Sequence, residues 1–162
     1  MDDRTIAGKQ QARAGRQSAR YDRDLYSWAR EQAALLRAGR IAEADALNIA
    51  EEIDDLGHEQ YDKLESALRI ILLHLLKWDH QPKRRSRSWW LSISVQRKFV
   101  LRVLQKNPGL KSVRDEAVTE AYETARMEAA AQTLLEEDVF PLECPYSWKD
   151  ITERKIRMPT ER

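Results

Sequence analysis

Cysteine, glycine and long apolar runs are all scarce in this chain of 162 residues. The lone Cys144 excludes an internal disulfide and fits a reducing compartment, so we expect a cytoplasmic protein. The longest apolar run, residues 70–73, is far shorter than the roughly 20 residues that a membrane-spanning helix needs. The first twenty residues have no apolar segment of the secretory type, and we therefore expect neither a secretory signal nor a membrane location.

Net charge is also low, at +1 for 28 basic and 27 acidic side chains, so no overall field draws the protein toward nucleic acid. The charges are nevertheless segregated. Residues 41–65 carry nine acids and one lysine, residues 80–114 carry ten Lys or Arg and no acid, and residues 115–138 carry eight acids and one arginine. This order suits helices that pair with neighbours of opposite charge.

Apolar residues recur at helical spacing, and strand-type alternation is lacking. We predict an all-α fold: a compact bundle of about five or six helices with a Pro-containing extended C-terminal segment. Residues 1–20 are polar and basic and are predicted to form an N-terminal arm, followed by a single helical domain over residues 21–158. The first helix is expected to begin near Asp24 and to end at Gly39.

The strongest helical signal lies in the second predicted helical region, residues 43–79. From Tyr61 to Trp78 apolar residues recur every three or four positions, and further leucines make the helix apolar most of the way round. Such a helix belongs at the centre of a bundle. An offset stripe upstream meets this one near Gly57, so the region is either one bent helix or two. The predicted core residues are Trp28, Leu64, Leu68, Ile71, Leu75, Trp78 and Trp89.

Later segments carry further local signals. Ser112 and Asp115 predict a capping box for a helix, and Ser147 and Asp150 predict a cap for a last turn. Four alanines spaced by four residues predict a close approach between two helices. They are Ala117, Ala121, Ala125 and Ala129.

Six distinctive stretches stand in order over roughly residues 21–150. They are DLYSWAREQAALLRAGR (24–40), NIAEEIDDLG (48–57), HLLKWDHQPKRRSRSWW (74–90), the QR and NPGLK of 96–111, EAYETAR (120–126) and FPLECPYS (140–147). In these stretches the chain resembles the bacterial domain-of-unknown-function family 29. The resemblance implies a compact all-helical fold and no agreed activity, ligand or catalytic residue.

The basic segment 83–106 allows two interpretations. As a nucleic-acid surface, its cations would contact phosphates while Trp90 stacks on a base. Alternatively the cations form a solvated turn that faces acidic helices, with Trp78 and Trp89 buried and Arg84 and Arg85 exposed. We favour the second interpretation. The candidate nucleic-acid or anion contacts are Lys83, Arg84, Arg85, Arg87, Trp90, Arg97, Lys98 and Arg102.

Patterns for catalysis or metal binding are weak. The Asp55-x-x-His58 pair has the wrong acid and no second copy for a di-iron bundle, and His74 and His80 lie about 120° apart around a helix. Cys144 has no nearby histidine to lower its pKa. We predict no catalytic residue, metal or cofactor, and we lean toward a non-enzymatic protein.

Interaction is the remaining functional class. The apolar face around residues 70–76 is wider than a single contact requires, so later helices or a two-fold homodimer must cover the surplus. We expect a cytoplasmic helical module that acts through self-association or an unidentified protein partner. RNA or DNA binding through residues 83–106 is the alternative.

Overall fold

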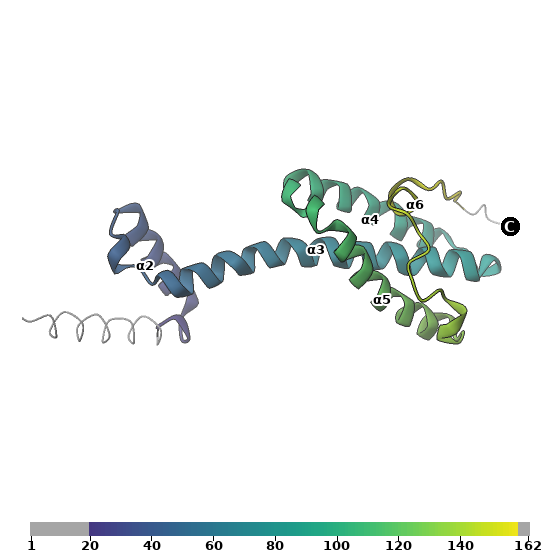
Figure 1. Ribbon diagram of the computed structural model, residues 1–162, viewed down its shortest axis with the longest axis horizontal. Coiled ribbons are helices and arrows are strands. Elements are labelled where there is room, and N and C mark those ends of the chain that lie inside the picture. The colour runs from purple at the N-terminus through teal and green to yellow at the C-terminus, as the bar shows by residue number, and fades with distance from the viewer. Residues whose placement is uncertain (1–19, 159–162) are drawn as a thin grey trace, which may run out of the picture. The chain divides into compact units, whose positions relative to one another are not determined.

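The computed structural model describes residues 20–158, and all regular structure in this range is helical (Figure 1). This confirms the predicted all-α class. The predicted arm over residues 1–20 lies outside the described residues, apart from Arg20. Short 3-10 turns precede or follow the α-helices, which are α2 (Leu25–Arg37), α3 (Ala46–His80), α4 (Arg87–Lys106), α5 (Arg114–Thr133) and α6 (Trp148–Glu153).

The described part of the chain divides into two compact units, with the boundary between Gly57 and His58. A single helical domain over residues 21–158 therefore stays a prediction. The segment expected to hold either one helix or two is one continuous helix, α3, and it runs from Ala46 to His80. Gly57 lies within this helix, and no atom would come within 4 Å of a side chain added there, so it is not a close-packing point.

Local capping signals account for several helix ends. Asp24 caps α2 by accepting a backbone N–H at 3.0 Å, and Gly39 follows that helix with a φ of 71°, a conformation that glycine adopts without strain. Ser147 and Asp150 form the predicted capping box of α6. The capping box predicted at Ser112 is wrong, because its hydroxyl donates to a carbonyl of its own 3-10 turn at 2.7 Å.

The first unit is organised around Trp28. This side chain is buried, its Nε1 donates to the Asp45 carboxylate at 3.3 Å, and the Tyr21 ring meets it edge-on at 4.9 Å between ring centroids. The buried Gln32 accepts the backbone N–H of Asp45 through its side-chain oxygen at 2.9 Å. The Tyr21 hydroxyl then donates to Glu52 at 2.8 Å, so polar contacts link α2 to the start of α3.

The second unit is built on the leucine-rich part of α3. Leu64, Leu68, Ile71 and Leu75 are completely buried, and so are the neighbouring leucines that widen the apolar face. They pack in one cluster with apolar side chains of α4, α5, α6 and the segment that joins α5 to α6. The surplus apolar surface was expected to be covered either by later helices or by a homodimer partner. Within this unit, later elements of the same chain cover it.

Helix α5 approaches α3 through its alanines. All four alanines of the predicted row are completely buried. On either side of this contact, Tyr61 donates to Glu120 at 2.7 Å and Lys77 donates to Gln132 at 2.7 Å. The small side chains allow the two helices to lie close, and these polar pairs fix how far one helix is shifted along the other.

Ala121→Leu tests this packing. A leucine has no room in the completely buried row, so we expect the free energy of unfolding to fall by about 2 kcal/mol. Urea unfolding followed by circular dichroism measures it. The matched control is Glu123→Leu on the exposed side of the same helix, for which we expect a change within about 0.5 kcal/mol. Equal losses for the two variants would contradict the close packing of α5 on α3.

Candidate functional site

The eight residues predicted to contact nucleic acid do not form one surface. Six of them, Lys83, Arg84, Arg85, Arg87, Lys98 and Arg102, are exposed, as predicted for Arg84 and Arg85. Trp90 and Arg97 are half-buried, and these two residues and Arg85 make specific contacts inside the second unit. A basic segment that is continuous in sequence is therefore divided between the surface and the interior of the unit.

Arg97 holds the C-terminal segment against α4. Its Nε donates to the carbonyl of Ile151 at 2.7 Å, and its two terminal nitrogens donate to the carbonyls of Asp150 and Arg154 at 2.8 and 2.7 Å. Two turns earlier along α4, the Trp90 Nε1 donates to the Ile156 carbonyl at 3.1 Å. The donors of Arg97 and Trp90 therefore already bind backbone carbonyls, and the assignment of these two residues to phosphate and base contacts stays a prediction.

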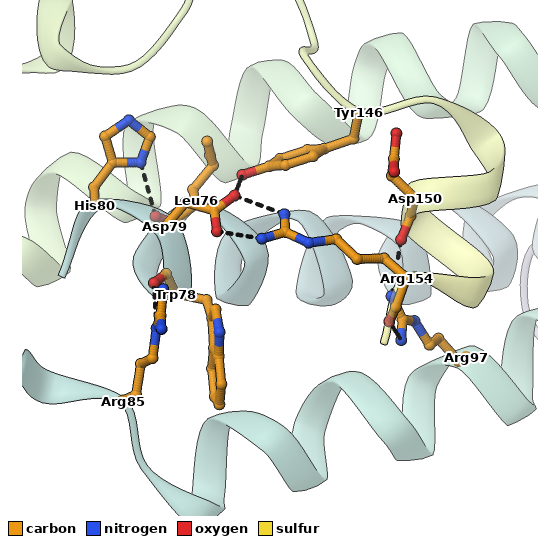
Figure 2. Close-up of polar contacts among 9 residues, drawn as sticks. All are labelled: Leu76, Trp78, Asp79, His80, Arg85, Arg97, Tyr146, Asp150 and Arg154. Atoms are coloured by element: carbon orange, nitrogen blue, oxygen red, sulfur yellow. Dashed lines mark hydrogen bonds and ion pairs between the residues drawn. The ribbon is translucent and has the colours of Figure 1, made fainter. Parts of the chain in front are cut away.

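Asp79 forms a second attachment point, and Figure 2 shows it facing the Arg154 side chain from the last turn of α3. The Arg154 guanidinium binds both carboxylate oxygens, at 2.6 and 2.8 Å, and the Tyr146 hydroxyl donates to one of them at 2.9 Å. Burial disfavours the charged carboxylate, but the hydrogen bonds from Arg154 and Tyr146 outweigh burial and lower the pKa of Asp79. We call Asp79, Arg97, Tyr146 and Arg154 the C-terminal clamp.

Tryptophans at the junction of α3 and α4 bind cations. Arg85 lies over the Trp78 ring at 5.2 Å and donates through Nε to the Trp78 carbonyl at 2.9 Å (Figure 2). Trp89, predicted as a core residue, is only half-buried. The reason is that the first turn of α4 places its ring over the Lys77 ammonium, at 4.6 Å, instead of within the leucine cluster.

Apolar and basic residues share the exposed side of α4. Leu91, Val95, Lys98 and Arg102 follow spacings of four, three and four residues and so lie on one side of the helix, with Leu101 beside them. All five are exposed. Within residues 20–158, Lys98 and Arg102 pair with no carboxylate. We call these five residues the outer face of α4.

A groove adjoins the outer face. It has a volume of about 370 Å³ and is bordered by Leu101, so it is continuous with the apolar residues of α4. Arg114 lies over the Trp148 ring at 4.9 Å in its wall, and Lys111 adds a second cation. The groove therefore extends the outer face with the same combination of an apolar surface and positive charge.

Groups suited to covalent or metal chemistry are not assembled in the described part of the chain. No three His, Cys, Asp or Glu side chains within residues 20–158 gather to hold a metal ion. Burial raises the pKa of the Cys144 thiol, which disfavours the nucleophilic thiolate. Burial also lowers the pKa of His74, whose Nδ1 lies 2.8 Å from the Ile70 carbonyl. Among the described helices, none has both the length and the apolarity to cross a membrane.

Comparison with known families fits this architecture. A family model described as "Domain of unknown function DUF29" matches residues 20–156. The chain belongs to this family. The match spans all five α-helices and the C-terminal clamp, and it confirms the resemblance found in the sequence. Neither the curated proteins nor the solved structures gave a match.

Two parts of this region of the DUF29 protein were not predicted from the sequence. The C-terminal clamp joins Asp79 to residues 67 and 75 positions away, and no local pattern marks such pairs. The exposed apolar residues of α4 were also not predicted, although their spacing in the sequence could have revealed them. Leu91 and Val95 lie at helical spacing on the side opposite the buried Ile93, Val100 and Val103.

Asp79→Asn tests the clamp. Because its pKa in the folded protein is below the unfolded value of 3.8, ionised Asp79 stabilises the fold above that pH, and this contribution is lost as pH falls through the folded pKa. At pH 7 we expect the variant to lose about 2 kcal/mol of unfolding free energy, which is typical for hydrogen bonds to a charged group. Urea unfolding measured from pH 7 to pH 3 should show the two proteins converging in acid.

The matched control is Glu153→Gln, which removes one exposed carboxylate from the same C-terminal region. Its stability at pH 7 should equal that of the unchanged protein. A constant difference between Asp79→Asn and the unchanged protein over the whole pH range would show that the charge of Asp79 contributes nothing.

Proposed function

We propose that the protein is a non-enzymatic interaction module, and that the outer face of α4 binds an acidic amphipathic helix of a partner protein. The observation that carries this proposal is the exposure of large apolar side chains among cations. Leu91, Val95 and Leu101 are 54%, 50% and 55% exposed, and Lys98 and Arg102 lie among them. A partner that covers this surface must supply apolar side chains and negative charge together.

The shape of the surface favours a helix as the partner element. The outer face is a strip along one straight helix, and the adjoining groove beside Trp148 and Arg114 provides a depression at which a bulky side chain can anchor. Amphipathic helices bind such surfaces through apolar residues spaced by three and four positions. Acidic residues at the margins of the partner helix would then meet Lys98, Arg102 and Lys111.

Nucleic-acid binding is the second candidate. The exposed Lys83, Arg84, Lys98 and Arg102, in a stretch of chain without acids, support it. The contacts of Trp90 and Arg97 with backbone carbonyls weaken it, because they remove the proposed stacking residue and one phosphate contact. Binding to phosphates would not account for the exposed leucine and valine side chains beside the cations, whereas binding to a protein partner would.

A designed helical peptide distinguishes the two candidates. The peptide carries leucines at i, i+4 and i+7 with glutamates beside them, and its control replaces every glutamate by lysine. We expect the full-length protein to bind the acidic peptide, and Lys98→Glu combined with Arg102→Glu to weaken binding at least about tenfold. Fluorescence anisotropy of labelled peptides, with the protein in excess, measures the affinity.

The matched control protein carries Lys83→Glu and Arg84→Glu, which change the net charge equally but lie outside α4. It should bind the acidic peptide normally. If the unchanged protein ignores the peptide but binds mixed-sequence RNA or DNA with a steep salt dependence, and both double variants weaken that binding, the proposed function is wrong and the nucleic-acid alternative replaces it.

A further inference from the structure

The first half of α3 has the features that the outer face of α4 requires of a partner. Ile53 and Leu56 are 61% and 63% exposed, and Ile49, half-buried, completes an i, i+4, i+7 row with them. Residues 46–59, the first part of α3, contain five acids and no Lys or Arg. This segment is therefore an amphipathic helix with exposed apolar residues and strongly negative surroundings.

Charge decides which surfaces can meet. A contact between the first half of α3 in one copy and the same segment in another copy would place acids against acids. A contact between the outer faces of α4 in two copies would place cations against cations. Both contacts are unfavourable. An α3 segment against an α4 outer face joins apolar residues to apolar residues and acids to cations. Asp55 and Glu59 on α3 are both exposed, as are Lys98 and Arg102 on α4, and Glu59 forms an exposed ion pair with Lys63 of its own helix at 2.8 Å.

We propose that the partner of the outer face is a second copy of this chain, whose Ile49, Ile53 and Leu56 dock on Leu91, Val95 and Leu101. This inference rests on the proposed function of the outer face. Each copy carries both surfaces, and two equivalent contacts of this kind would close a two-fold dimer. The exposed apolar residues of both helices then become buried by the same assembly.

Charge reversal on each surface tests the pairing. One variant carries Asp55→Lys and Glu59→Lys, which change the net charge of residues 46–59 from −5 to −1. The other carries Lys98→Glu and Arg102→Glu, so that both of its surfaces are acidic. We expect the unchanged full-length protein to dimerise in sedimentation equilibrium and each variant alone to associate at least about tenfold more weakly. An equimolar mixture of the two variants should recover the dimer, because the introduced lysines of one variant then face the introduced glutamates of the other.

Apolar contacts are tested without changing charge. Ile53→Ser combined with Leu56→Ser should weaken dimerisation. The matched control is Leu47→Ser, because Leu47 is 85% exposed on the same helix but lies about 120° around it from Ile53. The control should dimerise normally. All of these substitutions lie at exposed positions. Circular dichroism of each variant verifies that its helices are retained.

The failures of the two proposals are distinguishable. A monomeric unchanged protein overturns the second-copy inference, and so does a dimer that all of these substitutions leave intact. Binding of the designed acidic peptide is measured in the Asp55→Lys, Glu59→Lys variant, in which the outer face of α4 is unaltered. If that variant binds the peptide while the unchanged protein is monomeric, the proposed function survives and only the identity of the partner is wrong.

Discussion

Burial of the second half of α3 is the constraint on which the rest of the second unit depends. From Ile70 to Leu76 the helix is apolar on nearly every side, and its leucines are removed from water by elements of the same chain. An apolar helix of this kind is stable in water only when neighbours surround it. Helix α4, the alanine row of α5 and the C-terminal segment fill those positions, so the arrangement of each follows from the composition of one helix.

This packing also determines which cations are available for binding. The C-terminal segment has little regular structure of its own, and the C-terminal clamp attaches it through Arg97 to α4 and through Asp79 to α3. Cations on the inner side of α4 are therefore used to hold the chain together. Cations on its outer face stay in water beside Leu91 and Val95, and the proposed interaction surface is what remains after the core has been completed.

Local periodicity made much of the fold predictable. The apolar rhythm from Tyr61 to Trp78, the buried alanines and the capping box at Ser147 all depend on spacings of three or four residues, which a helix converts directly into a shared face. The contacts of Arg97 and Trp90 could not be predicted, for the converse reason. Their partners are carbonyls more than fifty positions away in sequence, and any residue type supplies a carbonyl, so the sequence carries no mark of the contact.

Residue-by-residue amide hydrogen exchange tests the central claim most directly. If the second half of α3 is the buried centre, amides from Leu64 to Trp78 should exchange only through global unfolding, with one common free energy. Amides from Leu47 to Leu56, in the exposed first half, should exchange with a clearly smaller free energy. Fast exchange between Leu72 and Leu76, comparable to that of the exposed half, would show that the leucines are not enclosed and would contradict the account.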